Sequence, residues 1–201
     1  MNLKDYCFYY DRIIPDRICD EIVNHCRQIP NEVGTVGTFN KSGKKDLGIR
    51  DSYVSFHGEQ NWIFNLINPI VKDTLEKAKW GFQIDYPETF QFTTYGHNQH
   101  YRWHVDQHHQ PYKEGDSYLI NKVRKVSVSI NLSNSFEYEG GDLYFDFRNK
   151  PNNTAAVETY PELRNKGSVI VFPSFVWHTV NPVTNGTRYS GVIWYLGESF
   201  K

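Results

Sequence analysis

Two short segments of the chain carry the residue types that can hold a divalent metal ion. In the first, Trp103-His104-Val105-Asp106, an imidazole and a carboxylate stand two positions apart. Because residues i and i+2 of a strand point to the same face, His104 and Asp106 can reach one cation. The chain has 8 histidines and 23 acidic residues, so an isolated HxD pair also arises by chance and does not by itself define a site.

The second segment, residues 175–180, puts His178 in an apolar predicted strand after a Pro173-Ser174 turn. Taken alone, such a histidine is more often a hydrogen-bonded core residue than a metal ligand. It lies far enough beyond His104, however, for a β-sheet fold to return the chain to the same place. Two histidines and one carboxylate from separated strands form the facial triad of non-haem Fe(II) oxygenases, which leaves coordination positions open.

A basic residue follows the second histidine at the start of the next predicted strand. Arg188 opens the predicted strand 188–196, and a guanidinium there can bind a carboxylate through two parallel hydrogen bonds. Residues 181–186 include Pro182 and an Asn-Gly pair, which predict a hairpin turn. Such a hairpin would bring Arg188 beside the strand of His178.

The elements that must position these residues begin with helices, because residues 1–80 read as mainly helical. We expect Asp16 to cap a helix that ends at Arg27, and a second helix over 60–79 that Pro69 kinks or restarts. Apolar residues at spacings of three or four predict the buried faces. These are Ile18, Ile22, Cys26 and Ile29 on the first helix, and Ile63, Leu66, Ile67, Ile70, Val71 and Leu75 on the second.

Short strands separated by Gly, Asn and Pro turns are expected through the rest of the chain, which is typical of a sandwich or jelly roll. The segments 31–49, 107–122 and 148–161 read as loops, and loops at the mouth of such a fold can contact a substrate. Trp103 and Trp177 alternate with the candidate ligands and are expected to face away from the metal. The expected strands are Phe90–Tyr95, Val126–Leu132, Leu143–Phe147, Ser168–Phe172, Val176–Val180 and Arg188–Leu196.

Taken together, these motifs resemble the Fe(II)/2-oxoglutarate-dependent dioxygenases, and most closely their prolyl 4-hydroxylase-like, PKHD-type branch. The resemblance covers residues 90–196. Beyond the HxD pair, the distal histidine and the basic residue, it rests on several further segments. They are Tyr95-Gly96, Tyr101, Ser129-Ile130-Asn131-Leu132, Tyr138-Glu139-Gly140-Gly141-Asp142-Leu143, residues 166–173 and residues 178–188.

The resemblance implies a mainly β, α+β fold with flanking N-terminal helices and a double-stranded β-helix (jelly roll) core. It implies one domain over 1–201, with helical support over about 1–85 and the core over about 86–198. Fe(II) would be held by His104, Asp106 and His178, with 2-oxoglutarate and O2 as co-substrates and ascorbate as a further candidate cofactor. The distal carboxylate of 2-oxoglutarate would bind Arg188 and a tyrosine, Tyr95 in preference to Tyr101.

The implied activity is hydroxylation of a C–H bond, with a prolyl residue in a protein or peptide as the first candidate substrate. A free amino acid or another small molecule is an alternative. A cupin-like binding module without turnover is a second alternative, disfavoured because all three ligands and the arginine are present. A zinc site would need a helix carrying residues such as His100, His104, His108 or His109, and the chain has no HExxH motif.

The overall composition disfavours other classes of partner. A net charge of −1 without a basic stripe disfavours nucleic-acid binding and nucleic-acid demethylation. No apolar run is long enough for a membrane span, and residues 1–5 lack the apolar stretch of a signal peptide. Cys7, Cys19 and Cys26 show no paired metal-ligand spacing and suit free thiols in a reducing cytoplasm. We expect a cytoplasmic monomer or weak dimer.

Overall fold

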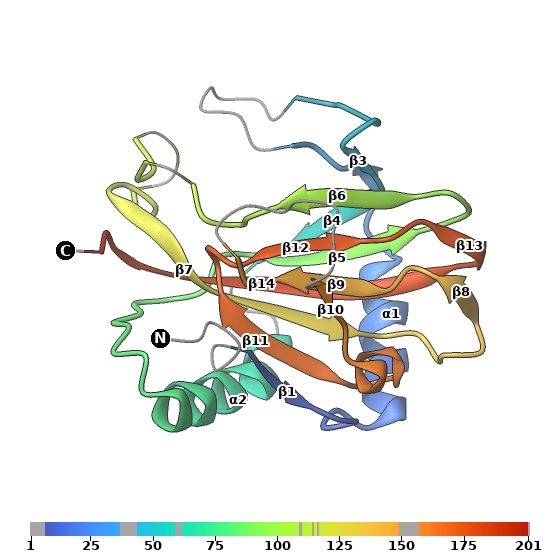
Figure 1. The fold of residues 1–201 in the computed structure, drawn as a ribbon, viewed down its shortest axis with the longest axis horizontal. Coiled ribbons are helices and arrows are strands. Elements are labelled where there is room, and N and C mark those ends of the chain that lie inside the picture. Colours follow the sequence, from blue (N-terminus) through green and yellow to red (C-terminus); the bar gives the residue numbers. More distant parts are fainter. Residues whose placement is uncertain are drawn as a thin grey trace.

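Two main β-sheets, a two-stranded ribbon and two α-helices form most of the described part of this protein in its computed structural model (Figure 1). The expectation of a mainly β fold with flanking helices is confirmed. Parts of the three predicted loops, residues 60 and 61 of the second predicted helix, and both chain ends lie outside the described residues. The structure describes residues 7–36, 44–58, 62–108, 110–113, 115, 117–148 and 157–200.

The larger sheet has seven strands in the order β1-β11-β7-β14-β5-β4-β2. Strands β7 and β14 pair antiparallel along most of their length and form its centre. All pairings within this sheet are antiparallel. Its strands are β1 (Phe8–Tyr10), β2 (Glu32–Val33), β4 (Tyr53–His57), β5 (Phe90–Tyr95), β7 (Lys122–Asn131), β11 (Val169–Pro173) and β14 (Arg188–Glu198).

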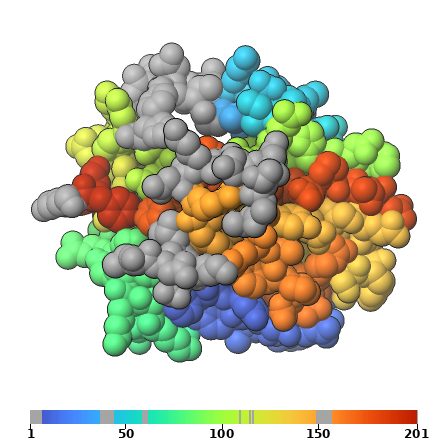
Figure 2. Space-filling view, viewed as in Figure 1, coloured from blue at the N-terminus to red at the C-terminus, as the bar shows by residue number. Residues whose placement is uncertain are grey.

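The smaller sheet has five strands in the order β10-β9-β12-β6-β3. Because β3 pairs with β6, residues near 50 and near 100 lie side by side, at the top of the view in Figure 2. A separate two-stranded ribbon pairs β8 (Tyr138–Gly140) with β13 (Val183–Gly186). The strands of the smaller sheet are β3 (Arg50–Asp51), β6 (His100–His104), β9 (Leu143–Asp146), β10 (Val157–Glu158) and β12 (Trp177–Val180).

The structure corrects details of both predicted helices, α1 (Asp16–Cys26) and α2 (Ile63–Ala78). The cap of α1 is Pro15 without a side-chain hydrogen bond, and Asp16 lies in the first turn, where its charge complements the helix dipole. Ile29 is 39% exposed because α1 has already ended. Pro69 lies inside α2, which neither ends nor restarts there. Among the described residues, no helix combines the length and the apolar character that a membrane crossing requires.

Alternation along the strands of the large sheet creates two separate cores. On β11, Val169 and Val171 pack with residues of α1 and α2, whereas Ile170 and Phe172 pack with residues such as Phe145 of the small sheet. The helices therefore cover one face of the large sheet, and the small sheet covers the other. The space between the two sheets is where a site can form.

The helical reading of residues 1–80 is wrong for β1, β3 and β4, and the short strand β2 lies in the segment 31–49 that was predicted to be a loop. These strands are two to five residues long. Such short strands carry too few alternating positions to show a period of two, and they form because the neighbouring strands offer them a ladder. Strand β4 pairs with β5 along its whole length, so the N-terminal part of the chain contributes directly to the large sheet.

Candidate active site

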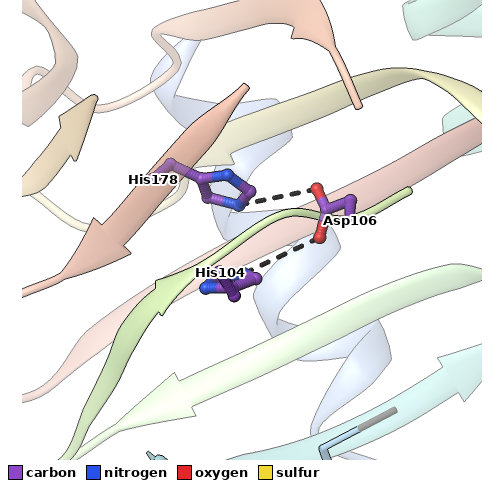
Figure 3. Close-up of side chains that lie close together, drawn as sticks. All are labelled: His104, Asp106 and His178. Atoms are coloured by element: carbon purple, nitrogen blue, oxygen red, sulfur yellow. Dashed lines mark ion pairs between the residues drawn. The ribbon is translucent and has the colours of Figure 1, made fainter. Parts of the chain in front are cut away.

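The structure brings His104, Asp106 and His178 together between the two sheets (Figure 3). His104 ends β6, and His178 is its direct partner on the neighbouring strand β12. The ligand atoms of the three residues all lie within 4.8 Å of one another. Asp106 follows β6 after the strand has ended, so the prediction that both HxD residues lie in one strand is wrong. Its carboxylate nevertheless reaches both histidines.

The carboxylate of Asp106 lies between the two imidazoles. Its Oδ1 is 3.7 Å from Nε2 of His104, and its Oδ2 is 3.5 Å from Nε2 of His178. Ligand atoms that share a cation at about 2 Å lie about 3 to 4 Å from one another. The three side chains therefore have nearly the spacing of a coordination site.

Backbone hydrogen bonds fix the tautomer of both histidines. Nδ1 of His104 lies 2.7 Å from the carbonyl oxygen of Arg102, and Nδ1 of His178 lies 3.0 Å from that of Val176. A carbonyl can only accept, so Nδ1 carries the proton in each ring. Nε2 then presents a lone pair, which is the atom a metal ion binds. The donor set of two imidazoles and a carboxylate fits Fe(II).

The protonation states of His104 and Asp106 also suit metal ligands. Burial, together with the neighbouring His178, lowers the pKa of His104 to about 3, so its ring is neutral near pH 7. Burial raises the pKa of Asp106, but the neighbouring His178 and His104 outweigh this effect and hold the pKa at about 2. A neutral imidazole and an ionised carboxylate are the forms that bind a metal.

The three residues face a cavity of about 990 Å³ between the sheets. Its size is at the upper end of ordinary ligand pockets. The predicted loops 31–49 and 107–122 both contribute walls, as expected for loops at the mouth of the fold. Trp103 and Trp177 do not line it, which agrees with their predicted outward direction. Besides the ligands, the lining includes Thr35, Val36, Arg50, Tyr95, Tyr101, Tyr112, Lys113, Arg124, Ser190 and Trp194.

Arg188 approaches this region from the large sheet. It opens β14 and lies directly opposite Tyr95 of β5 in the strand register. The hairpin predicted over 181–186 is wrong, because Val183–Gly186 form β13, which pairs with β8 instead. Between His178 and Arg188 the chain therefore crosses from the small sheet to the large one, and the two residues belong to facing sheets.

The guanidinium of Arg188 is buried without full hydrogen bonding. The residue is 4% exposed, and its Nη1 has no hydrogen-bond partner among the described residues. A buried unpaired donor is costly, and a carboxylate is its natural partner. Tyr95 lines the cavity, and Cζ of Arg188 lies 5.7 Å from the centre of the Tyr95 ring. A ligand carboxylate beside Tyr95 would give the unpaired donor of Arg188 a partner.

The two candidate tyrosines occupy different places in the site. Tyr95 lies beside Arg188, whereas the ring of Tyr101 stacks on His104 with centroids 3.5 Å apart. Burial raises the pKa of both phenols, to about 12 for Tyr101, so both keep a proton to donate. The geometry thus places Tyr95 beside Arg188 and Tyr101 beside His104 of the candidate ligand set.

Arg50 is a cavity residue that the sequence reading missed. It is 7% exposed, its Nε donates to Ser52 Oγ at 3.0 Å, and its Nη1 donates to the Thr35 carbonyl at 3.1 Å. Its Cζ lies 4.7 Å from the centre of the Tyr101 ring. Within the part of the chain that the structure describes, no carboxylate forms an ion pair with Arg50. The sequence gives little signal, because Arg50 follows a segment that reads as a loop.

Arg124 and Glu88 form a second missed feature of the cavity wall. Arg124 donates to both carboxylate oxygens of Glu88, each at 2.7 Å, and its Cζ lies 3.7 Å from the centre of the Trp194 ring. Tyr112 also donates to Glu88, at 3.0 Å. These contacts hold an aromatic and a cationic group rigidly against the cavity. Arg124 was missed because the alternating pattern predicted a strand that begins at Val126, whereas β7 already begins at Lys122.

Gly140 and Gly141 form the tight turn that the sequence predicts, with φ of 68° and 65°. A Cβ on Gly141 would lie 2.8 Å from Val183 and 3.2 Å from Cδ of Arg188. Gly141 has no side chain that could take part in chemistry, but the absence of a Cβ leaves room for the side chain of Arg188.

The alternative zinc site is not formed as proposed. His100 and His104 lie on strand β6. Two residues that are four positions apart lie much farther from each other along a strand than along a helix, so these histidines do not share a metal ion in the way the helical site would require. Among the described residues, His104, Asp106 and His178 are the three candidate metal ligands that lie close together. His109 lies outside the described residues.

Comparisons with known proteins agree with this geometry. Residues 90–196 match the model of the 2OG-Fe(II) oxygenase superfamily. A PKHD-type hydroxylase of Prochlorococcus marinus (strain MIT 9301) is 30% identical over 103 residues, which is 51% of this chain and 39% of the relative. One from Synechococcus sp. (strain CC9311) is 24% identical over 191 residues, 92% of this chain and 73% of the relative. Three relatives are matched over less than half of their length, at 39, 29 and 40%.

Solved structures share the fold along nearly the whole chain. A Pseudomonas putida prolyl-4-hydroxylase has a TM-score of 0.69 at 15% identity, covering 98% of this chain and 96% of its own. A Trichoplax adhaerens prolyl hydroxylase, solved with a hypoxia inducible factor peptide fragment, has a TM-score of 0.65 at 18% identity, covering 95% and 83%. The family implies Fe(II), 2-oxoglutarate and O2. Since the family match spans more than half of its 201 residues, the chain belongs to the 2OG-Fe(II) oxygenase superfamily.

Proposed function

We propose that this protein is an Fe(II)- and 2-oxoglutarate-dependent dioxygenase that hydroxylates a prolyl residue in a peptide or protein. The observation that carries the proposal is the cluster of His104, Asp106 and His178, in which both Nε2 atoms present lone pairs to a shared cavity. Membership of the superfamily supports Fe(II) as the metal and 2-oxoglutarate and O2 as co-substrates.

In this proposal the two ends of the co-substrate are held by different sheets. His104, Asp106 and His178 would hold Fe(II), and Arg188 with Tyr95 would bind the distal carboxylate of 2-oxoglutarate. When bound, iron with 2-oxoglutarate and O2 supplies the oxidising chemistry that hydroxylates a C–H bond. The protein would orient these groups, keep the imidazole of His104 neutral and neutralise the distal carboxylate of 2-oxoglutarate through Arg188. The walls of the cavity limit the access of bulk water.

The architecture supports a double-stranded β-helix (jelly roll) core within a single domain over 1–201. Two facing antiparallel sheets enclose the candidate site, and the helices pack on the outer face of the large sheet. Strands from the N-terminal part complete both sheets, which supports one folding unit. Cys7, Cys19 and Cys26 are free thiols, which supports a reducing, cytoplasmic environment.

A peptide or protein substrate is supported by the cavity and by the fold. A volume of about 990 Å³ is larger than a metal ion and a five-carbon di-acid need. Described residues of two loops line the cavity, where they could contact a longer chain, and a fold neighbour was solved with a peptide fragment. Trp194, fixed by Arg124, provides a flat apolar wall against which a pyrrolidine ring could pack.

Arg50 favours a second candidate, a free amino acid or another small carboxylate substrate. It is a buried cation in the cavity wall, and no carboxylate pairs with it in the described part of the chain. A buried charge gains from an opposite charge supplied by a ligand. A free amino acid brings such a carboxylate, whereas an internal peptide residue brings only carbonyl oxygens.

The test is succinate formation by purified protein with Fe(II), ascorbate and 2-oxoglutarate, measured with proline-rich peptides, with free proline and without substrate. We expect a peptide to stimulate succinate formation and His178→Ala to abolish it. Stimulation by free proline alone would favour the second candidate. The cupin-like binding module would be favoured if no succinate formed under any condition and the metal-loaded protein did not bind 2-oxoglutarate.

A further inference from the structure

Asp106 follows the end of β6, and contacts with the large sheet hold it in position. Strand β6 ends at His104, so the ladder that holds His104 does not hold Asp106. Instead, the backbone N–H groups of Asp106 and Gln107 both donate to the carbonyl oxygen of Ser174, each at 2.9 Å. Ser174 directly follows β11, and its own N–H donates to the carbonyl of Lys125 on β7 at 3.0 Å. The backbone of the candidate metal ligand is therefore tied to the large sheet.

A buried hydroxyl completes this arrangement at the side chain. Oγ of Ser127 on β7 donates to Oδ2 of Asp106 at 2.7 Å and lies 2.9 Å from Oγ of Ser174. Ser127 and Ser174 are both 0% exposed, and Asp106 is 8% exposed. A serine has one hydroxyl proton, and Ser127 gives its proton to the carboxylate. Ser174 must therefore donate to Ser127, which gives the order Ser174 to Ser127 to Asp106.

We propose that Ser127 is a positioning residue of the metal centre, with Ser174 as its support. This inference rests on the proposed function. The hydrogen bond to Oδ2 fixes the rotation of the carboxylate, which the irregular backbone after β6 leaves undetermined. It leaves Oδ1, 3.7 Å from Nε2 of His104, to serve as the single ligand oxygen. Hydrogen bonds to ligating carboxylates orient them and tune their affinity for the metal.

The hydroxyl of Ser127 is not needed for the sheet itself. Ser127 lies opposite Phe172 of β11 and opposite Trp194 of β14, and these pairings use the backbone. Replacement by alanine keeps this ladder and removes one oxygen atom. Its effect should therefore appear at Asp106 rather than in the strand pairing.

The experiment measures Co(II) binding to the metal-free protein by calorimetry and by the visible absorption of the bound ion. Ser127→Ala should weaken Co(II) binding by about tenfold to a hundredfold, the usual range for a lost partner of a metal ligand. It should also change the absorption bands, because the carboxylate no longer has one fixed orientation. Ser174→Ala should give a smaller loss, since the backbone carbonyl of Ser174 still holds Asp106.

A pair of variants matched in shape separates the hydroxyl from the packing. Ser127→Thr and Ser127→Val add the same bulk, and only threonine keeps the donor. We expect threonine to retain most of the Co(II) affinity and valine to lose it. This comparison remains informative even if Ser127→Ala fails to fold.

Ser168→Ala provides the control for loss of a buried hydroxyl elsewhere. Ser168 is 1% exposed and directly precedes β11, and its hydroxyl lies 2.8 Å from the carbonyl oxygen of Glu162 and 3.1 Å from Oδ1 of Asp11. This variant should lower thermal stability and leave Co(II) affinity unchanged. Wild-type Co(II) affinity and absorption in Ser127→Ala and Ser127→Val would overturn the positioning role and leave the proposed function intact. Failure of the wild-type protein to bind Co(II) would overturn both.

Discussion

Replacing Arg188 with methionine removes a buried cation and keeps an unbranched side chain in its place. Arg188 is 4% exposed, and its Nη1 lacks a hydrogen-bond partner among the described residues. If this group binds the distal carboxylate of 2-oxoglutarate, the variant should lose co-substrate affinity. Because the unpaired guanidinium is costly without a ligand, the same variant should make the ligand-free protein more stable.

Both magnitudes follow from the burial of the guanidinium. Truncating one partner of a buried charge pair costs about 3 kcal/mol, which corresponds to a dissociation constant raised about a hundredfold. Leaving a buried donor unpaired costs about 1 to 3 kcal/mol, part of which the methionine recovers. For a chain of 201 residues, a gain of about 1 kcal/mol raises Tm by about 2 to 4 °C.

The assay is calorimetric titration of 2-oxoglutarate into Co(II)-loaded protein, with thermal unfolding of the same samples before ligand is added. Arg188→Lys is the matched variant, since it keeps the charge but not the paired donors, and its affinity should fall between the other two. Co(II) affinity should be the same in all three proteins. An unchanged 2-oxoglutarate affinity in Arg188→Met would refute the reasoning, and Arg50, the other buried cation near Tyr95, would become the candidate.

Three further substitutions test the surroundings of the site. Gly141 has a φ of 65°, and a Cβ added there would lie 3.2 Å from Cδ of Arg188. Gly141→Ala should therefore lower the unfolding free energy in urea by about 2 kcal/mol and weaken 2-oxoglutarate binding. Tyr95→Phe should weaken 2-oxoglutarate binding by about 1 kcal/mol, whereas Tyr101→Phe should leave its calorimetric affinity unchanged. Glu88→Ala leaves the half-buried Arg124 without its carboxylate partner and should lower the unfolding free energy in chemical denaturation by about 2 kcal/mol.

Residue type and local alternation were sufficient to predict the candidate ligands and several strands. Strand β5 has the predicted bounds Phe90–Tyr95, and β14 begins at Arg188 as expected. The candidate ligands could be predicted because their chemistry is visible in single residues and short spacings. The argument from a continuous strand was wrong for Asp106, which follows the end of β6. Its carboxylate still lies near both histidines because the backbone after β6 is held by the carbonyl oxygen of Ser174.

What the sequence could not predict is which strands become neighbours. Alternation indicates the face on which Arg188 lies but not its partner, so a hairpin with the strand of His178 was expected where the chain crosses to the other sheet. Arg50 shows the same limit. It lies on a two-residue strand that forms by pairing with β6, and no local pattern in its own segment indicates that contact.

The division of the site between two sheets has a consequence for binding. His104 and His178 lie on the small sheet, whereas Arg188 and Tyr95 lie on the large one. A co-substrate that contacts the metal at one end and Arg188 at the other must therefore join the sheets across their shared core. It would add a polar link to the hydrogen bonds that already tie Asp106 to the large sheet and to apolar contacts such as Phe145 against Phe172. Since a ligand stabilises the state that it binds, metal and 2-oxoglutarate together should stabilise the packed sheets more than either does alone.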